Sequence, residues 1–133
     1  MKLLLDTNVL ISAFVFGGKA GKLLEKLFDS DYELLVSDYV DREFSAKLKE
    51  KWPNKAEQVY ALYRALPFIF CESSEHLKGS LRDPKDIPVL SDALAQNADV
   101  ILTGDRDFLE ANLERPQIFS PSMMLDFLES IGI

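Results

Sequence analysis

The sequence is poor in the side chains on which several common classes of protein depend. Its 133 residues include one cysteine, Cys71, and one histidine, His76. A single cysteine cannot form an intramolecular disulfide, and a lone histidine in the polar segment CESSEH is a weak candidate for the base of a serine or cysteine triad. We therefore expect neither a disulfide scaffold nor a triad hydrolase. Cys71 ends the apolar run PFIFC, where we expect a buried strand residue.

Long apolar runs and an excess of cations are also missing. No apolar run approaches the roughly 20 residues that cross a membrane, and Asp6 interrupts the first one too early for a signal peptide. We expect a cytoplasmic protein with no membrane partner. The net charge of −7 argues against a general nucleic-acid coat protein. A local cluster of lysines remains in the segment SAKLKEKWPNK, either as a solvated helix face or as a cationic rim: Lys47, Lys49, Lys51 and Lys55.

Short apolar runs alternate with longer stretches of helical periodicity. Strands are predicted over 2–5, 32–37, 68–71 and 98–105, with a weaker one over 117–120. Helical patterns lie between them, and include 38–52, the stretch between Pro53 and Pro67, and a segment after Pro88 whose Val89, Leu90, Ala93 and Leu94 are expected to point inward. Parallel strands need such crossovers. The sequence predicts a single domain over residues 1–133, built as a three-layer α/β/α sandwich around a mostly parallel sheet.

Acidic residues follow these elements at positions that a parallel sheet brings to one edge. Asp6 ends the first strand, Asp105 follows the fourth, and Asp86 lies at a helix N-terminus. Glu43 borders the buried stripe of the second long helix. Each acid also has a purely structural reading, because the aspartates can cap helices and Glu43 can pair with Lys47. Together they would repel one another unless a cation or proton intervened, and carboxylates without histidine or cysteine favour Mg²⁺ or Mn²⁺.

Three motifs in order resemble the PIN-domain family, in particular the VapC-like toxins of prokaryotic toxin–antitoxin systems. They are LLLDTNVLIS, VSDYVDREFSAKL and DPKDIPVLSDALAQNADVILTGDRDFL. The resemblance implies a metal-dependent ribonuclease whose acidic site comprises Asp6, Glu43, Asp86 and Asp105. It also implies supporting polar residues at Thr7, Asn8, Ser37 and Thr103. RDPKD offers Asp83 beside Asp86, and TGDRD offers Asp107 beside Asp105; we favour Asp86 and Asp105.

The chemistry agrees with that resemblance. Hydrolysis of a phosphodiester needs an activated water and compensation for negative charge on the phosphate, and a divalent ion supplies both. We expect Asp6, Asp86 and Asp105 to hold Mg²⁺ or Mn²⁺. For Glu43 three roles stay open, namely metal ligand, holder of a metal-bound water, or base. Lys85 and Arg106 are candidates for contacts with RNA phosphates, or plain surface charges.

Two other functions compete with the ribonuclease. An aspartate after a first strand also occurs as the nucleophile of phosphatases and phosphotransferases, although Asn8 stands where their second aspartate would be. A non-catalytic domain could use the acidic pocket for a structural cation or bind RNA without cutting it. The resemblance also implies an antitoxin partner and a homodimer. Either could cover apolar surface around Phe14, Phe16 and the segment 56–66, for which ordinary core burial is the alternative.

Overall fold

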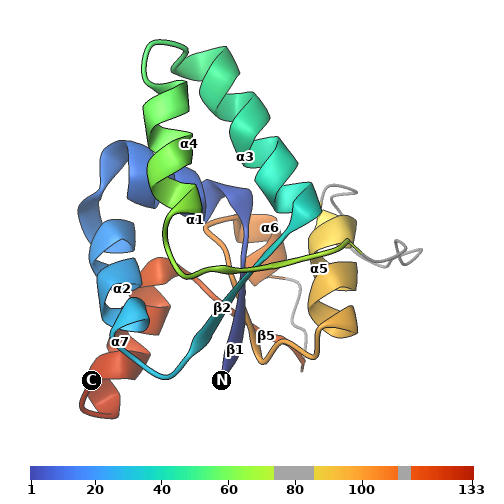
Figure 1. Ribbon diagram of the computed structural model, residues 1–133. Coiled ribbons are helices and arrows are strands. Elements are labelled where there is room, and N and C mark those ends of the chain that lie inside the picture. Colours follow the sequence, from blue (N-terminus) through green and yellow to red (C-terminus); the bar gives the residue numbers. More distant parts are fainter. Residues whose placement is uncertain (74–85, 111–114) are drawn as a thin grey trace.

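Five short strands form the centre of the computed structural model, and neighbouring strands are parallel (Figure 1). The structure describes residues 1–73, 86–110 and 115–133, with the side chains of Asp86 and Ile87 left out. Within these ranges the strands are β1 (Lys2–Leu5), β2 (Glu33–Ser37), β3 (Ile69–Cys71), β4 (Val100–Leu102) and β5 (Gln117–Phe119). Each lies inside a segment that the sequence predicts to be extended, so the predicted parallel sheet is confirmed.

Helices connect the strands and cover both faces of the sheet. They are α1 (Thr7–Ile11), the π-helix η1 (Ser12–Phe16), α2 (Gly18–Phe28), α3 (Asp38–Lys51), α4 (Ala56–Arg64), α5 (Asp86–Ala95), α6 (Arg106–Leu109) and α7 (Pro121–Ser130). Figure 1 shows α2 and α7 on one side of the sheet and α5 on the other. The fold is therefore the predicted three-layer α/β/α sandwich. No helix in the described parts of the chain is both long and apolar enough to span a membrane.

The central strand β1 explains why the sequence begins with an apolar run. Leu3, Leu4 and Leu5 are all fully buried. A parallel sheet covered on both faces buries successive side chains of its central strands, so alternation with polar residues is lost. β1 pairs with β2 on one side and with β4 on the other. The run LLL therefore marks the middle of the sheet.

The order of the strands changes direction beside β1. The sheet runs β3-β2-β1-β4-β5, so the chain moves outward from β1 through β2 to β3 and then returns to the opposite side of β1. In open parallel sheets, ligands bind at the carboxyl ends of the strands where the direction of winding reverses. Here that point lies between β1 and β4, where Leu5 pairs with Leu102. The next residues, Asp6 and Thr103, stand at this edge.

Some side chains differ from the sequence-based expectation in their burial. Leu94, predicted to point inward, is exposed. α5 lies in an outer layer, so only the stripe that includes Val89 and Ala93 reaches the core. Cys71 is half-buried, because it lies on β3, which has a neighbouring strand on one side only. Burial still raises the pKa of its thiol to about 11, with a further contribution from the negative charge of Asp92.

Candidate active site

Asp6 occupies the junction between β1 and α1 with its carboxylate turned into the protein. The residue is 8% exposed, and its backbone N–H continues the sheet by donating to Leu102 O at 2.9 Å. Its Oδ1 accepts a hydrogen bond from the Thr7 N–H at 2.8 Å, so Asp6 does cap α1. Its Oδ2 accepts from Thr103 Oγ1 at 2.7 Å and from Asn8 Nδ2 at 3.1 Å. The second oxygen therefore has a role beyond capping, since it joins the ends of β1 and β4.

Thr103 and Asn8 form a hydrogen-bonded network that fixes this carboxylate. The Thr103 hydroxyl donates to Asp6 and accepts from the Asp105 N–H at 3.0 Å. Asn8 donates from Nδ2 to Thr103 Oγ1 at 3.3 Å, and its Oδ1 accepts from the Gly104 N–H at 2.8 Å. Thr103 is fully buried. The bonds from Thr103 to Asp6, from Asn8 to Thr103 and from Gly104 to Asn8 join the residues that follow β1 to those that follow β4. The position of Asp6 is therefore set by both strands.

The carboxylates of Glu43 and Asp105 act on Asp6 through their charge. The pKa of Asp6 is raised above 3.8, first by burial and then by the negative charges of Glu43 and Asp105. The hydrogen bonds from Thr103 and from the Thr7 N–H act in the opposite direction, since they stabilise the ionised form. Three acids from separate parts of the sequence thus lie near enough to one another for their charges to interact at the carboxyl edge of the sheet.

Glu43 and Asp105 reach this edge for different local reasons. Glu43 is half-buried on α3, next to the fully buried Phe44. The alternative ion pair with Lys47 does not form between these two described residues. The ion pair near the start of α3 joins Arg42 to Asp38 at 3.8 Å. Asp105 caps α6, because its Oδ1 accepts from the Asp107 N–H at 2.9 Å.

Some of the other predicted site residues lie in the described part of the structure, and some lie outside it. Ser37 is fully buried and caps α3, with its Oγ accepting from the Val40 N–H at 3.2 Å. Thr7 is buried beside Asp6, and its hydroxyl lacks a hydrogen-bond partner within the described part of the chain. Asp86 begins α5, but its side chain lies outside the description, as do Asp83 and Lys85 entirely. Arg106 and Asp107 are exposed.

The donor set suits a hard divalent cation. The charged groups that act on Asp6 are carboxylates, which Mg²⁺ and Mn²⁺ prefer as ligands. A cation would also relieve the unfavourable charge interactions that raise the pKa of Asp6. Among the described residues, no three acids, histidines or cysteines are close enough to hold a metal by themselves. The full set that we expect includes Asp86, whose side chain lies outside the described residues.

Comparison with known protein families gives a match over most of the chain. Residues 2–107 match the PIN domain, and the match includes β1, α3, α5 and the segment after β4. The chain belongs to the PIN domain family. A search of curated protein sequences gives no match.

The solved structures that share this PIN fold include the following two. The VapBC2 structure from Rickettsia felis, bound to a DNA fragment from its promoter, superposes with a TM-score of 0.72 at 18% identity, over 90% of this chain and 98% of that one. VapC20 from Mycobacterium tuberculosis, described as a Sarcin-Ricin loop cleaving toxin, gives a TM-score of 0.63 at 13% identity, over 84% of this chain and 95% of that one. At these identities the likeness establishes the PIN fold alone.

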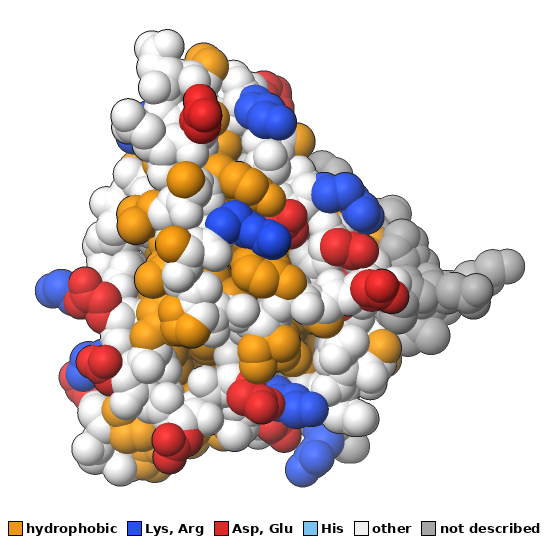
Figure 2. All heavy atoms as spheres, viewed as in Figure 1, with side chains coloured by type: hydrophobic (Ala, Val, Ile, Leu, Met, Phe, Trp, Pro, Cys, Tyr) orange, Lys and Arg blue, Asp and Glu red, His pale blue; other side chains and the backbone are white. Residues whose placement is uncertain are grey.

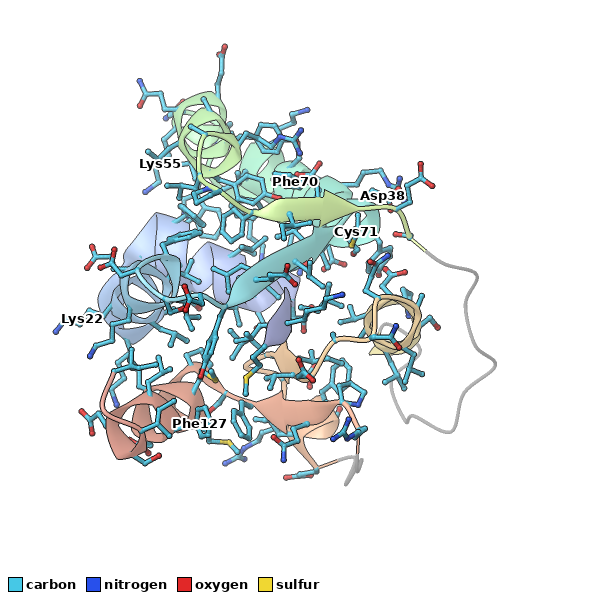
Figure 3. The ribbon with its side chains drawn as sticks, turned by 60° about the horizontal axis from the view of Figure 1, so that its bottom comes forward. Lys22, Asp38, Lys55, Phe70, Cys71 and Phe127 are labelled. Carbon is cyan, nitrogen blue, oxygen red and sulfur yellow. The ribbon has the colours of Figure 1, made fainter. Side chains whose placement is uncertain are left out.

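One buried acid near this edge of the sheet was missed by the sequence analysis. Asp92 is fully buried on α5, between Ser91 and Ala93, and its charge acts on Cys71. Figure 3 shows Cys71 and Asp38 close together at the carboxyl ends of β3 and β2. The signal was present in the sequence, because Asp92 falls three residues after Val89 on the inward stripe of the helix.

Proposed function

We propose that this PIN domain is a metal-dependent ribonuclease and the toxin component of a toxin–antitoxin system. The observation that supports this most strongly is the Asp6 carboxylate. It is buried, held by donors from both sides of the β1–β4 junction, and close enough to Glu43 and Asp105 for their charges to raise its pKa. A structural cap would not need this environment, because a cap needs one accepted hydrogen bond and gains nothing from neighbouring negative charge.

Asp6, Asp105 and Asp86 are the residues that we assign to hold Mg²⁺ or Mn²⁺. When bound, the ion would activate a water molecule and offset negative charge on the phosphate oxygens. Thr103, Asn8 and the Thr7 N–H keep the Asp6 carboxylate in one orientation before any cation arrives. Hydrogen-bonded partners of this kind typically preserve both metal affinity and ligand geometry.

We assign Glu43 as the base that accepts a proton from the attacking water. Its carboxylate is half-buried on α3 and acts on Asp6 through its charge, yet no ion pair with a described residue neutralises it. A carboxylate in that position can accept a proton at one of its Oε atoms. Arg106, exposed in the first turn of α6, and Lys85 are assigned to contacts with neighbouring phosphates.

The arrangement favours Asp6 as a ligand over Asp6 as a nucleophile. Both of its oxygens already accept hydrogen bonds, Oδ1 from the backbone and Oδ2 from two side chains. A phosphatase nucleophile must present an oxygen to phosphorus, which these donors hinder. Carboxylate oxygens keep further lone pairs for a cation while they accept such bonds.

Partners follow from the proteins that share the fold. One structural neighbour is a VapBC complex bound to promoter DNA, and the other is described as a toxin that cleaves the Sarcin-Ricin loop. By analogy we propose an RNA substrate, an antitoxin protein partner, a homodimer and a cytoplasmic location for this chain.

The test is cleavage of an end-labelled single-stranded RNA of mixed sequence, with Mg²⁺, with Mn²⁺ and with EDTA. We expect shortened RNA with either ion and intact RNA in EDTA. RNA that binds without being cut under all three conditions would identify a non-catalytic binding domain. A phosphoaspartate trapped on Asp6 after incubation with a small phosphate ester would identify a phosphotransferase. Either result would overturn the proposal.

A further inference from the structure

Two helical segments run side by side away from the acidic site. At one end, Asp6 caps α1, and the Glu43 side chain of α3 acts on it. At the other end, Phe16, the last residue of η1, packs edge-on against Trp52, which caps the C-terminus of α3, with ring centroids 5.7 Å apart. α1 also packs directly against α3. The two segments therefore connect the acids at one end to an aromatic pair at the other.

Phe16 is unusual for a large apolar side chain. It is 72% exposed, the highest value among the large hydrophobic residues that the structure describes. Burial of such a ring would be favourable, so its exposure is not explained by folding. It ends a π-helix, a form of helix that occurs frequently at functional sites. A ring that is largely exposed and held on one side by Trp52 is the kind of aromatic side chain on which unpaired bases stack.

Lysines lie along α3 between the acids and this ring. Lys47 and Lys51 follow Glu43 at intervals of four residues, so they continue the same side of the helix over about 12 Å. Lys47 is half-buried, whereas Lys51 and Lys55 are exposed. Figure 3 shows Asp38, the first residue of α3, and Lys55, just beyond its end, well apart. We call Lys47, Lys51 and Lys55 the lysine strip. Even with Glu50 among them, this part of an acidic chain is locally positive.

We propose that the lysine strip and the Phe16 ring bind single-stranded RNA that leads into the acidic site. The lysines contact successive phosphates, and one unpaired base stacks on Phe16. This inference rests on the proposed ribonuclease function, because the acids must be where the strand is cut. A cationic strip beside an exposed ring matches the charge and the flat bases of a single strand.

A second exposed surface differs in character. Figure 2 shows hydrophobic side chains gathered over α4 and β3, where Leu62 and Ile69 are exposed. Beside α4 lies a groove of about 280 Å³, lined in part by Phe14, Leu24 and Leu66. Such apolar surface suits protein partners better than RNA. The lysine strip is cationic instead of apolar, and this difference favours RNA as its partner.

The experiment measures binding of an end-labelled single-stranded RNA in EDTA by fluorescence anisotropy over a range of salt concentrations. The variants are Phe16→Ala, Phe16→Tyr and the double variant Lys47→Gln/Lys51→Gln. Lys49→Gln is the matched control, because Lys49 is exposed on the same helix but lines the pocket between α3 and α4. Melting curves and size-exclusion chromatography check the fold and the oligomeric state of each variant.

We expect Phe16→Ala to bind about fivefold to 100-fold more weakly and Phe16→Tyr to restore binding, because a tyrosine ring still stacks. The double lysine variant should lower the slope of log K against log salt by about 0.7 for each lysine. Lys49→Gln should keep the wild-type slope. Binding by the strip variants as tight and as salt-dependent as that of Lys49→Gln would overturn the inference, and so would a change of oligomeric state with RNA binding intact.

The same samples separate this inference from the proposed function. If the wild type cuts RNA with Mn²⁺ and the strip variants bind and cut RNA equally well, only the RNA-binding role of the lysine strip and Phe16 is refuted. A wild type that binds RNA through the strip but never cuts it refutes the ribonuclease and retains the RNA surface.

Discussion

At the scale of single residues, the Thr103 hydroxyl connects three groups of the site. It donates to Asp6 Oδ2, accepts from the Asp105 N–H, and receives a longer bond from Asn8. These contacts link the end of β1 to the segment that follows β4. The Thr103 hydroxyl therefore fixes the orientation of the Asp6 carboxylate and the position of the backbone at Asp105.

Thr103→Val should weaken both stability and catalysis while it preserves the shape of the side chain. Loss of the bond to a buried carboxylate should cost about 1–3 kcal/mol in the free energy of unfolding at neutral pH. Metal affinity or RNA cleavage should fall by about 10–100-fold. Urea unfolding and the RNA assay measure these effects. Thr103→Ser retains the hydroxyl and should recover most of both; a valine variant as active as the serine one would rule out this role.

The raised pKa of Asp6 predicts a pH-dependent difference between wild type and Asp6→Asn. Its folded-state pKa lies above the ordinary 3.8, so between the two values the folded chain retains a proton that the unfolded chain has released. The contribution of Asp6 to stability is therefore largest when the pH is below the pKa of Asp6 in the unfolded chain. It falls as the pH rises through the pKa of Asp6 in the folded chain. The amide that replaces the carboxyl in the variant does not titrate. In EDTA, Asp6→Asn should gain stability relative to wild type as the pH rises from 3.8 towards neutrality.

Urea unfolding of both proteins across that range measures this difference. Other titrating groups are common to both chains and cancel to first order. Stability curves that stay parallel would show that Asp6 carries no unfavourable charge in the folded state.

Asp105 and Asp107 provide a matched pair that tests which acid of TGDRD serves the site. Asp105 is half-buried and raises the pKa of Asp6, whereas Asp107 is exposed. Asp105→Asn keeps the side-chain oxygen that caps α6 but removes the charge, so RNA cleavage should fall nearly to the level seen in EDTA. Asp107→Asn should cleave nearly as well as wild type. The reverse order of activities would assign the ligand to Asp107.

At the scale of elements, a tyrosine cluster joins α4 to α3. The Asp41 carboxylate of α3 accepts hydrogen bonds from Tyr63 at 2.8 Å and from Tyr60 at 3.0 Å. Tyr63 is fully buried, with its ring against Phe44 and Phe70, and both burial and the bond to Asp41 raise its pKa. The exposed Arg64 guanidinium lies 3.7 Å from Asp41, a contact that solvent weakens.

Asp41→Ala should destabilise the protein by about 1–3 kcal/mol, chiefly because the buried Tyr63 hydroxyl loses its acceptor. Tyr63→Phe removes that hydroxyl, so its cost should be smaller in the Asp41→Ala background than in wild type. A double-mutant cycle by urea unfolding gives this coupling. Additive effects of the two changes would contradict a direct bond between them.

Element types were largely predictable, whereas their local details were not. The strands at 2–5 and 33–37 were recognisable from short apolar runs, and Pro53 and Pro67 marked the limits of the segment that contains α4. The sequence did not reveal the change from α1 to the π-helix η1, because both forms suit the same apolar spacing. Asp41 gave no signal either, since an acid in a helix resembles a solvated residue until α4 is packed on it.

At the scale of the whole molecule, strand order decides which residues meet. The sequence indicated that Asp6 and Asp105 follow strands, and the sheet places these strands next to each other. The hydrogen bonds from Thr103 and Asn8 to Asp6 could not be derived, because they depend on register across the junction. The prediction of unpartnered apolar surface has a mixed outcome: Phe16 and Leu62 are exposed, but Tyr63 is buried. The homodimer and the antitoxin stay predictions.

The most direct test of the account compares RNA cleavage by wild type, Asp6→Asn and the control Asp126→Asn in Mn²⁺. Asp126 is exposed on α7, so both changes remove one carboxylate but only one alters the site. We predict that Asp6→Asn loses cleavage almost entirely while its metal-free melting temperature equals or exceeds that of wild type, because a like-charge repulsion is gone. Asp126→Asn should cleave normally. Full activity in Asp6→Asn would contradict the account and leave Asp6 as a helix cap.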